Sequence, residues 1–411
     1  MIYKKLAFQL FWLLFPLSWC VSQDWKDHYH FNPQQTLNRI KFLDGMTGFT
    51  AGSLYNGSTE NIHITHDGGK TWANASSGYT AMRFMDIFIQ DQSTIFMSGN
   101  EGLVIRSKDG GMSWQTMNTH TKEQLWGIYF INAEIGFAVG SNGIIIRTKN
   151  GGNDWETIPT GINNLFYDVY FTPKGTGFAS GSNTLWKTDD LGLSWYPIAD
   201  FPFEAPADWI RCIKMVNEKV GFACADIGRI YKTEDGGDHW ERLASGVQEP
   251  LFDLDFVDEL HGIVCGFNGT ILKTDDGGLS WTPMISPLGI EHLYSIDLIS
   301  KDLGFICTHT GRILKLNMAS GTHIANTDLI TMYPNPCTNY IKIQLNAITQ
   351  TEVKQINICT MNGSINPVQG HWLNDRELQI NIPLGCVGMA TVQIELEHKI
   401  ITVPVIILNA E

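Results

Sequence analysis

The sequence THDGGKTW at residues 65–72 decides the fold, because close copies of it recur along the chain. All copies share a Ser or Thr, an Asp or Asn two positions later, glycine, and a closing Trp. The five other copies end at Trp114, Trp155, Trp195, Trp240 and Trp281, at spacings of 42, 41, 40, 45 and 41 residues. A period of about 40–45 residues is typical of one four-stranded blade of a β-propeller.

Each period contains the pattern of four strands. The first strand is apolar and alternating, as in FYDVYF at Phe166–Phe171. A GFAVG-type second strand follows (Gly136–Gly140), and then a third such as GIIIRT at Gly143–Thr148. The repeated motif comes after the third strand, and its Trp opens the fourth. Alternation with a period of two and Gly/Asn turns predict strands throughout.

Seven first strands are present, although the motif occurs six times. They start near Leu37, Phe84, Leu125, Phe166, Ile210, Leu251 and Leu293. The seventh unit lacks a fourth strand, whereas Trp25 precedes Leu37 at the distance that separates a motif Trp from the next first strand. We therefore expect the N-terminal segment to supply the outer strand of the last blade, which removes an unpaired sheet edge.

The repeated motif has a structural logic. An early Asp or Asn accepts hydrogen bonds from the following N–H groups, glycine permits the turn, and the indole anchors the blade. A metal or carboxylate site is the alternative, but copies on separate blades cannot converge on one substrate. We therefore assign structural roles to Asp67, Trp72, Asp109, Trp114, Asn150, Trp155, Asp190, Trp195, Asp235, Trp240, Asp276 and Trp281.

These motifs resemble Asp-box, or BNR, repeats. Seven units, short loops and a closing N-terminal Trp resemble most closely the photosystem II assembly and stability factor family, over about residues 25–318. The resemblance implies an all-β, seven-bladed propeller that acts as an assembly or binding factor. Sialidases, some glucanases and sortilin-like receptors carry the same box, so the box specifies the fold far better than the function.

The C-terminal segment carries a second resemblance. Tyr-Pro-Asn-Pro at Tyr333–Pro336, an Asn-Gly turn at Asn362–Gly363 and Ile-Pro-Leu-Gly at Ile382–Gly385 resemble the type A sorting domain of the type IX secretion system. The expected fold is a small immunoglobulin-like β-sandwich. An ordinary carbohydrate-binding or packing module is the alternative. The basic residues that usually end such a domain are replaced here by apolar ones.

The N-terminus resembles an export signal. Lys4 and Lys5 precede an apolar run at residues 6–17, and small residues follow, which predicts cleavage after Ser22. A membrane anchor is an alternative, as is a lipoprotein signal processed at Cys20. The expected organisation is a signal peptide at 1–22, the propeller at 23–318, a linker at 319–328 and the sorting domain at 329–411. The chain is then secreted or displayed at the cell surface of a Bacteroidetes-type bacterium.

Composition excludes some partners. The formal net charge is −14, which repels nucleic acid and anionic lipid. Of the eight cysteines, Cys224, Cys265 and Cys307 recur at one repeat position and are expected to be small buried apolar residues. Cys212 and Cys224 lie on neighbouring strands, where a disulfide is geometrically possible but weakly indicated. No metal-ligand spacing, phosphate loop or nucleophile motif is present, and no cofactor is expected.

A binding site is expected at the channel mouth, on the face opposite the boxes. One position near the start of the first strands holds Asn38, Met85, Trp126, Tyr167, Arg211, Phe252 and Tyr294. The long connection at residues 196–208 adds Asp208. From these we select Trp126, Tyr167, Asp208, Arg211, Phe252 and Tyr294 as candidate ligand-binding residues, with packing between blades as the alternative role of the row.

Three functions remain open. A non-enzymatic propeller would bind a protein or peptide at the mouth, as a monomer that also meets the secretion machinery through its last domain. A glycosidase or lectin would use the same face. Hydrolysis would require two facing carboxylates, for which Asp208, Glu204, Glu249 and Glu291 are the candidates. A spacer or adhesin without a discrete ligand is the third possibility.

Overall fold

The computed structural model describes residues 25–317, except 32–34, 55–60, 76–77, 80–81 and 204–207, and most of the C-terminal strands between residues 330 and 407. The expected signal peptide and linker lie outside the described residues. The propeller belongs to one compact unit, Ser22–Gly321, and the C-terminal strands to another, from Thr322 onward. In the described part, no helix has the length and apolar character needed to cross a membrane.

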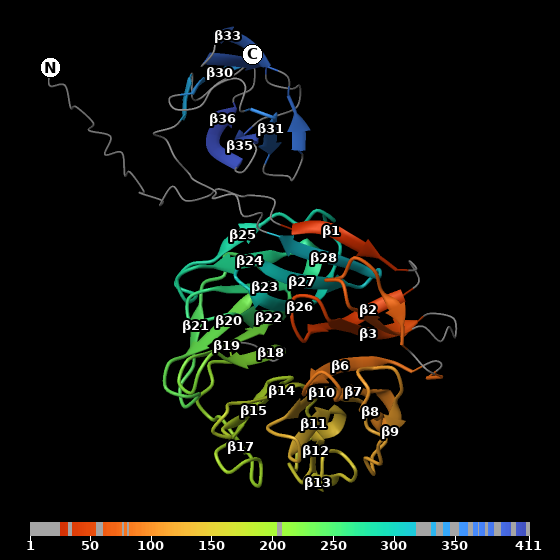
Figure 1. Cartoon of the computed structure of the whole chain (residues 1–411). Coiled ribbons are helices and arrows are strands. Elements are labelled where there is room, and N and C mark those ends of the chain that lie inside the picture. The colour runs from red at the N-terminus through yellow and green to blue at the C-terminus, as the bar shows by residue number, and fades with distance from the viewer. Residues whose placement is uncertain are drawn as a thin grey trace, which may run out of the picture. The chain divides into compact units, whose positions relative to one another are not determined.

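Seven four-stranded antiparallel sheets form a ring of blades in the first unit, as the all-β propeller prediction required (Figure 1). The innermost strands are β2 (Gln35–Phe42), β6 (Phe84–Ile89), β10 (Leu125–Phe130), β14 (Phe166–Phe171), β18 (Ile210–Met215), β22 (Leu251–Phe256) and β26 (Leu293–Ser300). The second strands are β3 (Gly48–Leu54), β7 (Ile95–Gly99), β11 (Gly136–Gly140), β15 (Gly177–Gly181), β19 (Gly221–Ala225), β23 (Gly262–Gly266) and β27 (Leu303–Thr308).

The outer half of each blade is shorter. The third strands are β4 (Ile62–Thr65), β8 (Val104–Ser107), β12 (Ile145–Thr148), β16 (Thr184–Thr188), β20 (Arg229–Thr233), β24 (Ile271–Thr274) and β28 (Arg312–Asn317). The fourth strands are β5 (Ala73–Asn74), β9 (Gln115–Thr116), β13 (Glu156–Ile158), β17 (Tyr196–Pro197), β21 (Glu241–Leu243) and β25 (Thr282–Met284). Single 3-10 turns, η1 (Asn100–Gly102), η2 (Ser141–Gly143) and η3 (Phe267–Gly269), link second to third strands.

The seventh blade is completed by the start of the chain, as the spacing of Trp25 predicted. Strand β1 (Trp25–His30) pairs antiparallel with β28, and Trp25 lies opposite Leu316. The Trp25 side chain is fully buried among Ile296, Leu314 and Leu316. The ring is therefore closed by strands from both ends of the propeller sequence.

Aromatic side chains pack one blade onto the next. The ring of Phe96 on β7 stacks on Phe130 of β10 with centroids 4.0 Å apart, and Phe222 stacks on Phe256 at the same distance. The box tryptophans meet these phenylalanines edge-on, as Trp155 does with Phe130 at 5.9 Å. Such offset and T-shaped pairs stabilise the core beyond their apolar area.

The recurring cysteines are part of this core. Cys224, Cys265 and Cys307 are fully buried, as their repeat position predicted. Cys212 lies directly opposite Cys224 in the pairing of β18 with β19, and both thiols are free. Burial raises the pKa of both thiols far above the ordinary value, so they remain protonated apolar groups.

The C-terminal unit contains two further four-stranded sheets. One has the order β29 (Ile330–Tyr333), β30 (Tyr340–Leu345), β34 (Glu377–Asn381), β33 (Gly370–Asn374). The other has the order β32 (Ile365–Pro367), β31 (Gln355–Thr360), β35 (Gly388–Glu395), β36 (Ile400–Ile407). Two antiparallel sheets fit the expected sandwich, while its immunoglobulin-like character stays a prediction.

Candidate functional site

A β-bulge occurs near the start of every innermost strand. In β10, Leu125 pairs with Gly140 and Gly127 pairs with Val139, so the register passes over Trp126. A bulge of this kind inserts one unpaired residue and redirects its side chain. The residues passed over in the seven strands are Asn38, Met85, Trp126, Tyr167, Arg211, Phe252 and Tyr294. They are the row that the sequence placed at the mouth.

Glycine at the end of the second strand accompanies this bulge. A Cβ at Gly140 would lie 1.9 Å from the carbonyl oxygen of Gln124, and one at Gly181 would lie 2.0 Å from that of Leu165. The residue before the first strand therefore approaches the second strand too closely for any side chain there. Blades five and seven carry Ala225 and Thr308 at this position, so their geometry tolerates a side chain.

All seven bulge residues line one cavity of about 630 Å³, which we call the mouth cavity. Its other lining residues are Thr36, Arg39, Ser53, Arg83, His309 and Thr310. The wall thus combines four aromatic rings with three arginines, and none of these lining residues is an Asp or Glu. A concave pocket that combines aromatic faces with fixed polar groups is suited to bind a ligand.

Arg211 is a cation of the mouth cavity that aromatic rings and an ion pair hold in place. Its guanidinium carbon lies 4.5 Å from the ring centroid of Tyr167, 4.8 Å from that of Trp209 and 5.7 Å from that of Phe252. Nε and Nη2 donate to the two carboxylate oxygens of Asp226 at 2.9 and 3.2 Å. Because the ion pair and the rings hold the planar group, its remaining N–H donors are preorganised for a ligand oxygen.

Asp208 is not a mouth residue, contrary to the sequence expectation. Its side chain is fully buried outside the mouth cavity, 2.8 Å from Nη1 of Arg229, and it accepts a 2.6 Å hydrogen bond from the Tyr231 hydroxyl. The neighbouring strand β20 supplies both partners, so the carboxylate stabilises the long connection before β18. Glu249 and Glu291 do not line the mouth cavity either, and Glu204 lies outside the described residues.

A column of stacked rings stands beside the mouth. The centroids of Phe267 and His292 are 3.9 Å apart, and those of His292 and His309 are 4.7 Å apart. Nδ1 of each histidine accepts a backbone N–H, from Asn268 and His292 respectively. Burial and the nearby His309 lower the pKa of His292. This lowered pKa and the N–H that its Nδ1 accepts both favour a neutral His292 ring.

The boxes lie at the other end of each blade and form a repeated hydrogen-bonded turn. In the fourth box, Oδ1 of Asp190 accepts the Thr188 hydroxyl and the Ser194 N–H, and Oδ2 accepts the Ser194 hydroxyl. The Ser194 hydrogen bonds lower the pKa of Asp190 to about 2. Asn150 makes the Oδ1 contacts of this turn in the third box, with Thr148 and Asp154. These Asp and Asn hydrogen bonds are all local, while other atoms of the turns also meet neighbouring blades, as the Gly151 carbonyl oxygen does with Arg106.

Aspartates of the innermost strands join neighbouring blades. Asp168 accepts the N–H of Val169 in its own strand at 2.8 Å and that of Ile213 in the next blade at 3.0 Å. Asp86 and Asp253 do the same with the following blades, at Ile128 and Ile296. Sequence analysis missed these residues. The available signal was a charged residue at one repeated position of otherwise apolar strands.

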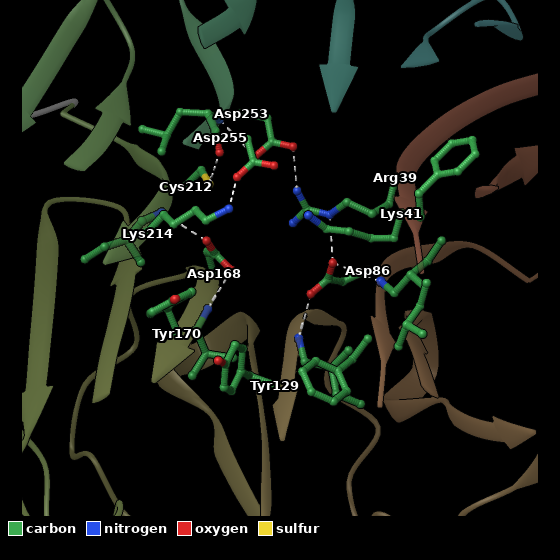
Figure 2. A pocket seen from close by; sticks show the side chains of 18 residues that line it. Arg39, Lys41, Asp86, Tyr129, Asp168, Tyr170, Cys212, Lys214, Asp253 and Asp255 are labelled. Carbon is green, nitrogen blue, oxygen red and sulfur yellow. Dashed lines mark hydrogen bonds and ion pairs between the residues drawn. The ribbon is translucent and has the colours of Figure 1, made fainter. Parts of the chain in front are cut away.

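These aspartates also line a second cavity of about 240 Å³, the channel cavity, shown in Figure 2. Arg39 pairs with Asp86 at 2.7 Å and with Asp253 at 3.0 Å, and it lines both cavities. Burial lowers the pKa of Arg39, but the two carboxylates outweigh burial and raise it. Among the described residues, no group of three or more His, Cys, Asp or Glu side chains has the arrangement of a metal site.

Comparison with known proteins agrees with this architecture. Residues 75–149 and 239–315 match the family model described as photosynthesis system II assembly factor YCF48. Residues 331–408 match the model described as a secretion system C-terminal sorting domain. No curated protein matches the chain in sequence.

Many solved structures resemble the chain, and three of them illustrate the shared propeller fold. "YCF48 bound to D1 peptide" is 20% identical with a TM-score of 0.60, and covers 72% of this chain and 98% of its own. YCF48 from Cyanidioschyzon merolae is 21% identical with a TM-score of 0.58, over 71% of this chain and 98% of its own. The WD40 propeller domain of Doa1 is 10% identical with a TM-score of 0.54, and the match covers 72% of this chain and 97% of the Doa1 chain.

Proposed function

We propose that the chain works outside the cell as a binding module, because it combines a seven-bladed propeller that matches the YCF48 family model with a segment that matches a secretion sorting domain. Its ligand is a protein or peptide segment held in the mouth cavity. The sorting domain directs the chain to type IX secretion, so the protein is released or attached at the cell surface. We do not transfer a photosynthetic role, because a likeness to the YCF48 structures at 20% and 21% identity shows the fold alone.

The layer of bulge residues carries this proposal. A β-bulge occurs in all seven innermost strands, and it places the side chains of the seven bulge residues around one cavity. Aromatic rings and arginine are the residue types most enriched where protein contacts contribute most binding energy. A protein of similar fold, YCF48, is known with a bound D1 peptide, which is consistent with a peptide as the class of ligand.

Glycan binding is the second candidate, since the rings of Trp126, Tyr167, Phe252 and Tyr294 offer flat apolar faces to a sugar. Hydrolysis is disfavoured, because a glycosidase requires two carboxyl groups about 5–10 Å apart at the substrate. Among the described residues, none that lines the mouth cavity carries a carboxyl side chain. We therefore propose a non-enzymatic role, and a lectin is the form that the glycan alternative would take.

The proposed boundaries of the mature protein follow from the sequence. We assign a signal peptide to residues 1–22, the propeller to 23–318, a linker to 319–328 and the sorting domain to 329–411. Intact-mass measurement of the protein recovered from host culture medium tests the assignment. A mature chain that begins at another residue, or that retains the leader, would contradict it.

The decisive experiment is a binding screen with the purified full-length chain against a peptide library, host surface proteins and a glycan array. We expect Trp126→Ala and Arg211→Ala each to weaken the selected ligand at least tenfold, which corresponds to about 1.4 kcal/mol. Tyr196→Ala is the matched control, because Tyr196 is an exposed aromatic residue on the outer strand β17. It should leave the affinity unchanged.

Each other outcome has a distinct meaning. Binding that survives both mouth substitutions would remove the mouth cavity from the proposal. Selection of sugars alone would make the protein a lectin. Turnover of a polysaccharide that is lost on substitution of Arg211 would overturn the non-enzymatic role.

A further inference from the structure

The channel cavity is lined by both cations and carboxylates, whereas the described lining of the mouth cavity holds cations alone. Three cations face it, namely Arg39, Lys41 and Lys214. Five carboxylates belong to the same network. Asp86 and Asp253 pair with Arg39, Asp297 pairs with Lys41 at 2.9 Å, and Asp255 pairs with Lys214. The fifth carboxylate, Asp168, has no ion-pair partner among the described residues.

The Asp168 carboxylate is fixed in an orientation that can accept a cation. Its residue is 8% exposed, and backbone N–H groups of Val169 and Ile213 fix one oxygen each. Each oxygen retains a lone pair, since a carboxylate offers about four acceptor positions. Figure 2 shows Asp168 and Lys214 reaching in from one side of the cavity, and Arg39 and Lys41 from the opposite side. Arg39 attracts Asp168 without forming a direct ion pair with it. A buried carboxylate that lacks a direct ion-pair partner is costly, which favours a cationic ligand.

Aromatic rings form the wall beside this carboxylate. The ring centroids of Phe88 and Tyr129 are 5.2 Å apart, those of Tyr129 and Tyr170 are 5.1 Å apart, and all three residues line the channel cavity. Ring faces attract ammonium groups that have left water. Ile87 and Ile89 add an apolar surface that suits an alkyl stem.

We propose that the channel cavity is a second binding site, which takes a primary ammonium group on a short alkyl stem. Asp168 provides the counter-charge, and the wall of Phe88, Tyr129 and Tyr170 provides the ring faces. The proposal is independent of the function assigned to the mouth cavity, because different residues carry it and only Arg39 lines both cavities.

Calorimetric titration of the full-length chain with n-butylammonium chloride tests the site, at pH 7.5 and constant ionic strength. We expect saturable binding of one equivalent, and none when sodium chloride replaces the amine salt. Asp168→Asn should weaken binding at least tenfold, because it removes the counter-charge. Asp302→Asn, at an exposed aspartate outside the cavity, should leave binding unchanged.

Two further measurements keep the test independent of folding defects in Asp168→Asn. Phe88→Leu removes one ring but keeps an apolar side chain, and should weaken binding a few-fold. In the unmodified chain, binding should fall roughly tenfold between pH 7.5 and pH 5, because burial raises the pKa of Asp168 to about 6 while the amine stays charged.

The other titratable groups that face the cavity are Arg39, Lys41, Asp86, Tyr129, Tyr170, Cys212, Lys214, Asp253 and Asp255. Burial lowers the pKa of Lys214 to about 8, so Lys214 already carries most of its charge at pH 7.5. The fall between pH 7.5 and pH 5 therefore reports mainly on Asp168.

Lack of saturable binding by the unmodified chain would overturn the proposal. So would equal binding by a folded Asp168→Asn variant. Equal binding of sodium would replace the ammonium assignment with a general cation site.

Discussion

The box turns and the mouth layer repeat in opposite ways. In the boxes the residues repeat, and each Asp or Asn makes the same local hydrogen bonds to its own turn. In the mouth layer only the backbone position repeats, while the side chains range from Asn38 to Trp126 and Arg211. Repetition of residue identity therefore marks structure here, and repetition of position with varied residues marks the candidate recognition surface.

The largest test of this contrast replaces one tryptophan from each layer. Trp155 of the third box is 2% exposed and packs on Phe130, so Trp155→Ala should destabilise the chain by about 3–5 kcal/mol. Trp126 is only partly buried at the bulge, and Trp126→Ala should cost about 1 kcal/mol or less. Urea unfolding of both variants measures the difference. Equal losses in the free energy of unfolding would contradict the assignment of a structural role to the boxes and a recognition role to the mouth layer.

An intermediate effect is expected where the bulge meets the second strand. Gly181→Ala places a methyl group 2.0 Å from the Leu165 carbonyl oxygen, so the strands must shift. We expect a loss of about 1–3 kcal/mol in urea unfolding, together with a changed near-ultraviolet signal from Tyr167 and its neighbours. Ala225→Gly alters the equivalent position of the fifth blade and serves as the control. If Gly181→Ala were as stable as the parent, close approach would not be what forms the bulge.

The smallest effect concerns the pH dependence of a box. The pKa of Asp190 is about 2 in the folded chain and about 3.9 in the unfolded chain. Its contribution to stability is therefore present above about pH 4 and is lost as the pH falls towards 2. Asp190→Asn should remove this loss while lowering the melting temperature at pH 7 by about 1–2 °C. If the melting temperature of Asp190→Asn fell with decreasing pH as steeply as that of the unmodified chain, the Asp190 carboxylate would make no such contribution.

Much of the fold was predictable from the sequence, because its signals are local and repeated. The 41-residue period, the alternating first strands and the distance from Trp25 to Leu37 indicated seven blades and the closing strand before any contact was known. The mouth row was found as an equivalent position. Its cause, a bulge in each strand, was hidden because alternation reports burial and not hydrogen-bond register.

The misplaced and missed residues depend on contacts between elements. Asp208 seemed available to a ligand because it ends a long loop, and nothing local reveals that Arg229 and Tyr231 enclose it. The channel carboxylates were not predicted from the sequence. Their pairing with Arg39 joins blades that are far apart in sequence, and only the closed ring brings them together.

The pairing of β1 with β28 also determines when the propeller can exist. Trp25 is among the first residues of the ring to be synthesised, and its partner Leu316 is among the last. During that interval β1 lacks its partner strand β28. A pairing between residues so far apart in sequence is expected to form slowly. The sorting domain follows β28 in the sequence. A chain whose sorting domain has been synthesised therefore already contains every strand needed to complete the ring.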